Sequence, residues 1–142
     1  MTDSFTTTYA TVDNVAGHEH GILIFNNRLG TACSMNGYPQ VWFNNPLFRD
    51  KMAAAATKDT SVSPSLVILQ PAGSLKAALT ITQAGFVDGC TIVNSIAFLV
   101  SQPLDHEATD DASELGYVRI DPTPACSNPS IGLLQVGPVT AP

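Results

Sequence analysis

Residues 75–82 read Leu-Lys-Ala-Ala-Leu-Thr-Ile-Thr, and in this stretch apolar side chains alternate with polar or small ones. Successive side chains of an extended chain point to opposite faces of a sheet, so a period of two indicates a half-buried β-strand. An apolar run, Leu66-Val67-Ile68-Leu69, comes shortly before it, and Pro71-Ala72-Gly73 between the two predicts a turn. The stretch therefore predicts two successive strands and favours an all-β fold.

The same pattern extends to both ends of the chain. Six more stretches are apolar runs, alternate in polarity, or are rich in the Thr, Tyr and β-branched residues that suit pleated sheets. They are residues 5–12, 22–25, 41–43, 96–100, 117–120 and 133–136. Eight short strands separated by turns predict a β-sandwich or barrel, and without a repeat or boundary we expect one domain over residues 1–142.

One segment departs from the strand pattern. The run from Ala53 to Ala56 makes the stretch from Arg49 to Thr57 a helix candidate, because alanine is the best helix former. A segment this short is marginal as a helix on its own. We therefore expect one or two helical turns or an irregular loop there.

Charge is scarce in this sequence, which excludes several classes of partner. Charged residues make up 13% of the chain, about half the roughly 25% of an average soluble domain, and the net charge is −6. A phosphate backbone or an anionic membrane surface would repel such a chain, so we expect no nucleic acid partner. No apolar run reaches the roughly 18 residues of a membrane-spanning helix, so we expect no membrane insertion. The N-terminus, residues 1–5, lacks a basic segment followed by an apolar one, so it is not a signal peptide. Two explanations follow: a leader has been removed, or the protein leaves the cell by another route, for example inside a virus particle.

Three stretches are more specific than a hydrophobic pattern. Residues 26–39 read NNRLGTACSMNGYP, residues 69–74 read LQPAGS, and residues 133–139 read LLQVGPV. In this order they resemble an actinobacterial family of secreted and lipoprotein domains with a C-x-x-x-G-Y-P segment and an L-x-V-x-P-V ending. The resemblance runs from about Gly17 to Val139.

The resemblance implies an immunoglobulin-like antiparallel β-sandwich, here of about 7–9 strands, and an extracytoplasmic location, but no reaction. It also implies a structural disulfide between Cys90 and Cys126, which match the later cysteine pair of the family. Members usually carry a further cysteine near the N-terminus, and this chain has none. Cys33 is therefore expected to be an unpaired, buried thiol.

The segment Gly37-Tyr38-Pro39 has a structural and a ligand-binding interpretation. Glycine supplies an unusual backbone angle, proline fixes the next one, and a tyrosine at a corner packs with its hydroxyl group on a backbone partner. We favour the structural turn over a ligand site, because a corner residue explains all three residue types.

Two clusters of polar residues are candidates for chemistry. His18 and His20 lie two positions apart, on one face of a strand, and such a pair binds a metal ion when a third ligand joins it. Asp105, Glu107, Asp110, Asp111 and Glu114 form an acidic loop without the glycine and spacing of a calcium site. We interpret the histidines as a polar strand end and the acidic loop as a solvated contact for a basic partner.

Neither catalysis nor an interface has a clear motif. The chain has no G-x-S-x-G nucleophile elbow and no glycine-rich phosphate loop, so we expect no enzyme activity and no cofactor. Trp42, Phe43 and Phe48 are aromatic neighbours. They are either core residues or anchors of an interface with another protein.

The sequence favours three functions in this order. The first is a structural or decoration protein on a virion surface, such as that of a phage of actinobacteria, held in many copies by a protein partner. A polar but nearly uncharged surface and the expected lack of a leader favour it. The second is the secreted or cell-envelope binding domain that the resemblance implies. The third is a metal-binding protein or enzyme that uses His18 and His20.

Overall fold

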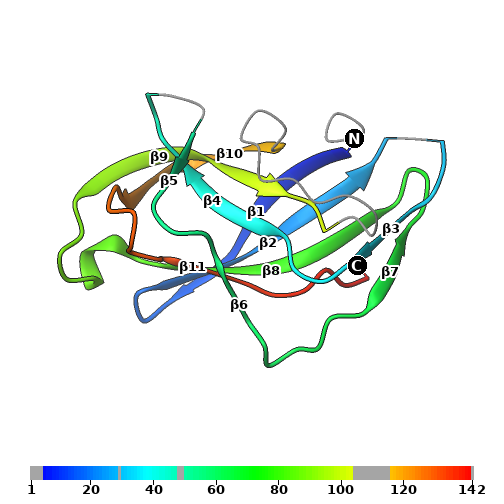
Figure 1. The fold of residues 1–142 in the computed structure, drawn as a ribbon, viewed down its shortest axis with the longest axis horizontal. Helices are drawn as coiled ribbons and strands as arrows, with labels where there is room; N and C mark the ends of the chain where they lie inside the picture. Colours follow the sequence, from blue (N-terminus) through cyan, green and yellow to red (C-terminus); the bar gives the residue numbers. More distant parts are fainter. Residues whose placement is uncertain (1–4, 29, 48–49, 104–115, 142) are drawn as a thin grey trace.

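The computed structural model describes residues 5–28, 30–47, 50–103 and 116–141. Within this part of the chain lie eleven β-strands and one 3₁₀ turn, η2 (Ala84–Phe86), but no α-helix (Figure 1). The strands are β1 (Phe5–Val15), β2 (His18–Asn27), β3 (Cys33–Asn36), β4 (Gln40–Asn44), β5 (Lys51–Met52), β6 (Thr57–Lys58), β7 (Leu66–Leu69), β8 (Ser74–Thr82), β9 (Ile92–Ser101), β10 (Gly116–Cys126) and β11 (Leu134–Val136). No helix among these residues is long and apolar enough to cross a membrane.

The strands form three sheets. The largest has the order β1-β2-β8-β11-β6, the second has the order β10-β9-β4-β5, and β3 pairs with β7 in a two-stranded sheet. All pairings are antiparallel except that of β11 with β6, which run parallel. Figure 1 shows β9 and β10 along the upper edge of the molecule and β8 and β11 across its lower part.

The two larger sheets share one hydrophobic core. In β8 the alternation predicted from the sequence is observed: Leu75, Ala77, Leu79 and Ile81 are buried, and the residues between them are exposed or half-buried. Across the core the second sheet contributes side chains from β4, β9 and β10, among them Phe43 and Phe98. The all-β prediction is confirmed, because the period of two sends one apolar side chain after another into the same core.

A tight hairpin joins β1 to β2. Its turn residues, Ala16 and Gly17, have φ angles of 52° and 83°, so both occupy the left-handed region. Two such residues form the kind of two-residue turn whose twist matches that of antiparallel strands. Glycine adopts this backbone freely, whereas alanine does so at a cost.

The sequence motifs meet in space. Asn27 at the end of β2 donates its side-chain amide to the carbonyl groups of Thr31 and Leu69, at 2.9 and 3.2 Å. Its backbone N–H donates to the carbonyl of Gly73, in the turn before β8. The carbonyl of Gly37 in turn accepts the N–H of Val139, near the C-terminus. The three stretches that carry the family resemblance therefore hold one another together.

The structure corrects two expectations and decides between two alternatives for a third segment. The described part of the helix candidate, residues 50–57, holds no helix: β5 and the start of β6 lie there, and residues 53–56 between them form the irregular loop that was the alternative, with a φ of 66° at Ala53. The backbone N–H of Ala56 instead donates to the carbonyl of Val41, so tertiary pairing outweighs the helix propensity of alanine. The strands also exceed the expected 7–9, because β3, β5 and β6 add to the predicted eight, and the β6–β11 pairing is parallel.

Candidate binding groove

A groove lies where the free edges of the two larger sheets meet. β1 is the edge strand of one sheet and β10 the edge strand of the other, and the two strands are in contact. Both are irregular at this place: the β1 register shifts between Thr11 and Asp13, and the β10 register shifts between Arg119 and Thr123. Bulges bend a strand away from its neighbour and are frequent beside binding sites. Here they leave an opening between the sheets.

Glu19 on β2 lines the groove in its middle, where an apolar half and a more polar half adjoin. It continues the face of β2 that carries Gly21, Leu23 and Phe25, all of which point into the core. Its carboxylate is therefore aimed between the sheets at the point where the core ends. The side chain is half-buried.

Tyr9 on β1 holds the Glu19 carboxylate in place. The Tyr9 hydroxyl donates to Oε2 of Glu19 at 2.6 Å, and the Thr11 hydroxyl donates to the same oxygen at 3.4 Å. Hydrogen bonds to an ionised acceptor are short and strong, so the 2.6 Å bond fixes the carboxylate. Among the described residues, no hydrogen bond to Oε1 and no ion pair of Glu19 is found.

The Tyr9 ring has a tightly defined position. It packs edge-to-face on Phe98, with the ring centroids 5.3 Å apart and the planes at 85°. On its other side it lies over Gly21, where a Cβ atom would overlap the phenol oxygen and ring. Burial, and after it the hydrogen bond to Glu19 and the Glu19 charge, raise the pKa of Tyr9 well above its ordinary value of 10.0. The phenol is therefore a donor throughout the physiological range.

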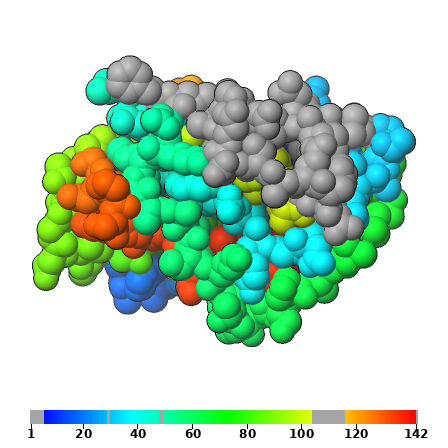
Figure 2. Space-filling model, in the orientation of Figure 1, coloured from blue at the N-terminus to red at the C-terminus, as the bar shows by residue number. Residues whose placement is uncertain are grey.

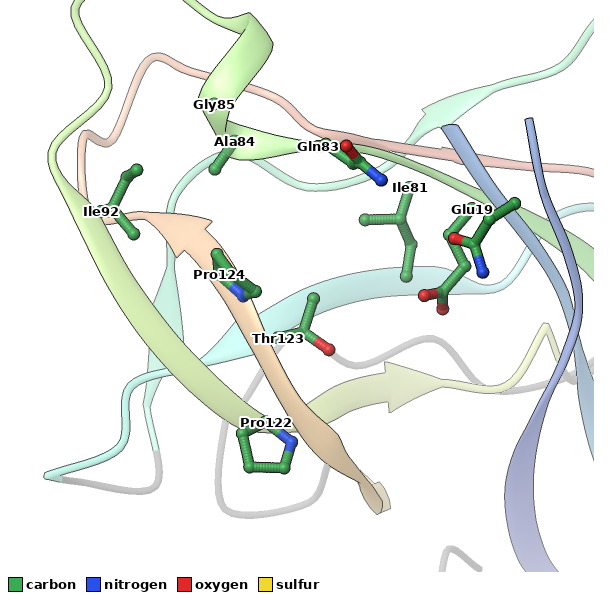
Figure 3. A pocket seen from close by; sticks show the side chains of 10 residues that line it. Glu19, Ile81, Gln83, Ala84, Gly85, Ile92, Pro122, Thr123 and Pro124 are labelled. Carbon is green, nitrogen blue, oxygen red and sulfur yellow. The ribbon is translucent and has the colours of Figure 1, made fainter. Parts of the chain in front are cut away.

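The groove has an apolar half beyond Glu19. Its volume is about 440 Å³, within the range of ligand sites. Figure 3 shows Pro122, Thr123 and Pro124 along one wall, with Ile81 and Glu19 across from them. Gln83, Ala84 and Gly85 close one end, and Ile92 lies at another.

The other half of the groove is more polar. Its volume is about 670 Å³, and Tyr9, Thr11 and Glu19 line it from the larger sheet. Arg119 and Asp121 line it from β10, together with the backbone of the bulge. Glu19, Pro122 and Thr123 belong to both halves, so the two form one continuous groove.

Exposed apolar side chains lie at the apolar end. Phe86 is 73% exposed and Ile92 is 55% exposed. The Phe86 ring lies over Gly17 at the hairpin tip, and the N–H of Gln83 donates to the Gly17 carbonyl at 2.8 Å. Figure 2 shows the blue hairpin tip beside the yellow-green segment that contains η2. Exposed apolar surface at the mouth of a groove is typical of a binding site.

The histidines that the sequence singled out lie away from this groove. His18 and His20 lie on the opposite, outer face of β2 and are exposed. Nδ1 of His20 is 2.7 Å from a carboxylate oxygen of Asp13, and Nδ1 of His18 is 3.4 Å from the Thr82 hydroxyl. Within the described ranges no group of three or more His, Cys, Asp or Glu side chains is placed to hold a metal ion.

Two of the three candidate interface residues, Trp42 and Phe43, are covered by the chain itself. Phe43 is 1% exposed in the main core, against Phe98. Trp42 is 9% exposed on the other face of β4, where Leu99 and Ala55 contact it and the Lys51 ammonium lies 4.3 Å from its ring centroid. Phe48 and the acidic loop of residues 105–114 lie outside the described residues.

The Gly37-Tyr38-Pro39 segment forms internal contacts. Gly37 has a φ of 101°, in the left-handed region, and Pro39 is buried. The Tyr38 hydroxyl donates to the carbonyl oxygens of Asp59 and Val62, at 3.3 and 3.1 Å. The segment thus ties the loop between β6 and β7 to the connection between β3 and β4.

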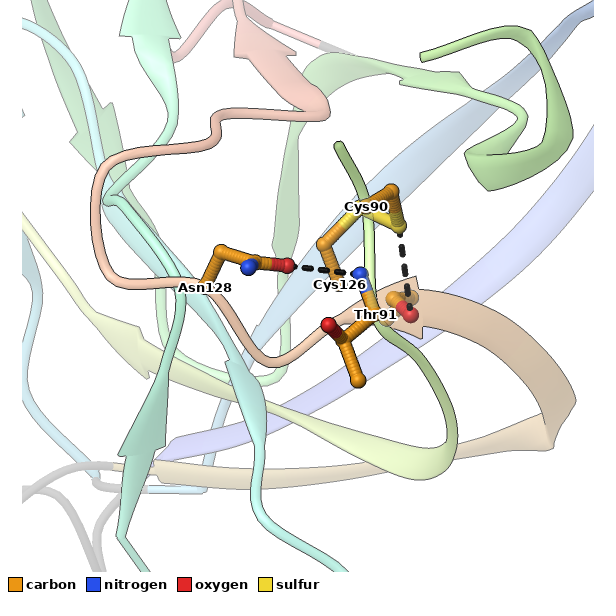
Figure 4. The surroundings of a disulfide bond; sticks show 5 residues. Cys90, Thr91, Cys126 and Asn128 are labelled. Carbon is orange, nitrogen blue, oxygen red and sulfur yellow. Dashed lines mark hydrogen bonds between the residues drawn. A yellow bond between two sulfur atoms is a disulfide. The ribbon is translucent and has the colours of Figure 1, made fainter. Parts of the chain in front are cut away.

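A disulfide joins Cys90 to Cys126 at the end of β9 and β10 (Figure 4). Cys126 is fully buried, and the side-chain carbonyl of Asn128 accepts the N–H of Thr91 beside the bond. The bridge thereby fixes the ends of β9 and β10 next to the apolar half of the groove. Cys33 on β3 is free and half-buried, not fully buried as expected.

Sequence reasoning missed Glu19, although it examined its neighbours His18 and His20. A signal was present: Gly21, Leu23 and Phe25 follow Glu19 in steps of two, which places Glu19 on the core face and the histidines on the outer face. The β10 side of the groove had no such signal, because the bulge depends on how β10 meets β9.

Together these features define an all-β protein with an open groove between two sheet edges. The chain belongs to the family described as Domain of unknown function (DUF4232), which matches residues 2–140. Comparison with curated proteins gave no match, and comparison with solved structures gave none either. The actinobacterial and secreted character implied by the sequence resemblance stays a prediction.

Proposed function

We propose that this protein is a non-enzymatic binding domain that works outside the reducing cytosol, and that its ligand occupies the groove around Glu19. The observation that carries the proposal is the Glu19 carboxylate, which faces an open groove and is bonded only through Oε2 among the described residues. A polar anchor beside an apolar wall, here Ile81, Ile92 and Pro124, is a usual composition of a ligand site. The Cys90–Cys126 disulfide supports an oxidising location.

A fragment screen tests the site. A library of small amines, acids, sugars and dipeptides would be added to ¹⁵N-labelled protein, and amide shifts recorded. We expect the shifts to concentrate on Glu19, Ile81 and Thr123, which line the groove. Shifts scattered over other surfaces, or no shifts at all, would contradict a binding site there.

We also propose that the two larger sheets form an immunoglobulin-like sandwich. Their shared core and largely antiparallel pairing support it. The disulfide lies at the end of the β9–β10 pair and does not cross the core between the two larger sheets, which differs from antibody domains. An experimental structure of the protein checks this assignment.

The virion hypothesis remains a separate proposal with less support. It requires many copies of the chain on one particle, and neither the structure nor the family match bears on such an assembly. Sedimentation of the native source material, with mass spectrometry of each fraction, distinguishes the two. Recovery with large particles favours a virion protein, whereas recovery as a small species in the medium or envelope favours the binding domain.

A further inference from the structure

We infer that Glu19 anchors a basic side chain, arginine or lysine, from an extended peptide segment of a partner protein. The inference rests on the proposed function and adds the chemical class of the ligand. It is carried by the bonding of the carboxylate, by the apolar wall next to it and by the form of the groove.

The carboxylate has acceptor positions that no described protein donor fills. An ionised carboxylate has about four acceptor positions on its two oxygens. Tyr9 and Thr11 both donate to Oε2, and in the described structure Oε1 accepts no hydrogen bond and no cation lies within ion-pair distance. A guanidinium or ammonium group brings several N–H donors and a compensating charge. The protein as a whole, with a net charge of −6, attracts a basic ligand.

The anchor is held rigidly before the ligand arrives. Tyr9 is fixed between Phe98 and Gly21, and it holds Oε2 at 2.6 Å. A carboxylate fixed in this way loses little conformational entropy on binding. Oε1 is the oxygen left to accept the donors of the ligand.

The apolar half of the groove fits the methylene stem of an arginine or lysine side chain. Ile81, Pro124 and Ile92 line a surface beside Glu19. The methylene stem of arginine or lysine packs on apolar surface while its charged end reaches a polar partner. A small hydrated cation would leave this surface uncovered.

The shape of the groove favours a peptide over a single small molecule. Two halves of about 440 and about 670 Å³ meet at Glu19, so residues on both sides of the anchored side chain find room. Pro122 and Pro124 have no N–H to donate, so a peptide cannot add to this part of β10 as a regular strand. Along this part of β10, side chains therefore contribute more to recognition than strand pairing does. Arg119 in the polar half disfavours a second basic residue next to the first.

Two matched peptides test the inference. The probes are acetyl-Val-Arg-Val-amide and the same peptide with citrulline, a neutral residue of nearly the same shape, in place of arginine. Each is titrated into ¹⁵N-labelled protein at low salt. We expect the arginine peptide to shift the amides of Glu19, Ile81 and Thr123, and to bind at least about tenfold more tightly than the citrulline peptide.

Two variants locate the effect. Glu19→Gln keeps the size of the side chain and removes its charge, and it should abolish the preference for arginine over citrulline. Asp59→Asn, a matched change on the loop after β6 and outside the groove, should retain the preference. If the Glu19→Gln variant fails to fold, the comparison of the two peptides on the wild-type protein still decides the inference.

The outcomes separate the inference from the proposed function. Equal binding of both peptides in the groove overturns the basic anchor and leaves the binding groove standing. Agmatine, a free amine with a guanidinium group, tests whether the ligand is a peptide. If it binds as tightly as the arginine peptide, the peptide part of the inference is overturned. Absence of groove shifts with both peptides overturns the inference, and a fragment screen that is also blank overturns the proposed function.

Discussion

Glu19 shows how a single residue is used differently from its immediate neighbours. A carboxylate on the core-facing side of a strand is unfavourable unless it is hydrogen-bonded, because burial removes its hydration. Here the Tyr9 hydroxyl supplies that bond, and Gly21 supplies the space for the Tyr9 ring. The three residues lie on adjacent strands and depend on one another, so changing any of them should affect the other two.

The Tyr9 phenol should make the stability of the protein fall at alkaline pH. Its folded-state pKa is raised by burial and by Glu19, so above about pH 10 the unfolded chain loses this proton and the folded chain keeps it. The contribution of Tyr9 is therefore complete below that pH and is lost as the pH rises further. Urea unfolding of the wild type and of Tyr9→Phe measures it. The stability difference between them should shrink from about pH 9 to pH 11, and a constant difference would contradict the raised pKa.

Gly21→Ala should disrupt the groove by displacing the Tyr9 ring. The added Cβ would overlap the Tyr9 ring, which Phe98 prevents from moving aside. Overpacking of this kind destabilises by about 1–3 kcal/mol. Urea unfolding gives the free energy of unfolding, and the Tyr9 ring resonances report its displacement. Gly85→Ala is the control, because a Cβ there meets nothing within 4 Å, and equal effects of the two changes would refute the argument.

At the scale of elements, the edges of the sheets carry the irregular features. β1 and β10 each contain a bulge, and β10 carries Pro122 within its irregular part and Pro124 just after it. Bulges and prolines protect edge strands from pairing with other chains. In this protein the same features open the groove, so protection of the edge and formation of the site have one physical cause.

The β1–β2 hairpin should tolerate a better turn residue. Ala16 has a φ of 52°, a conformation that asparagine adopts more readily than alanine. Ala16→Asn should therefore raise the free energy of unfolding by about 0.5–2 kcal/mol, measured by urea denaturation. Gly17→Ala should have the opposite effect, because Gly17 has a φ of 83° and its Cβ would meet the Phe86 ring at 3.1 Å. A destabilised Ala16→Asn variant would show that this turn is not limited by backbone conformation.

The strands that the sequence predicted are those whose own residues alternate in polarity, form an apolar run or favour pleated sheets. Seven of the eight predicted stretches lie within strands, the eighth begins one residue before β11, and Pro71 and Ala72 form the expected turn before β8. The missed strands β5 and β6 have two residues each and exist because β4 and β11 pair with them. No local pattern encodes such a strand. For the alanine run the sequence left a helical turn and an irregular loop open, because its intrinsic propensity favours a helix, and contacts such as that of Ala56 with Val41 decide for the loop.

At the scale of the whole molecule, the groove was harder to predict than the fold. Each wall comes from a different sheet, and the residues that meet there, such as Glu19 and Thr123, are far apart in sequence. The period of two tells which residues share a face, but it does not tell where two sheets separate. The family resemblance, by contrast, rested on residues such as Asn27 and Gly37, which hold the fold together.

The Cys90–Cys126 disulfide affects the stability of the whole molecule. Cys90 and Cys126 are 36 positions apart, and closing a loop of this length stabilises a protein by about 3–4 kcal/mol in the chain-entropy model. Reduction should therefore lower the free energy of unfolding by about that amount, measured by urea denaturation with and without reductant. Cys33→Ser, which leaves the bridge intact, is the control and should respond to reductant like the wild type. A denaturation midpoint that reductant does not change would refute a stabilising bridge, and with it the main support for an oxidising location.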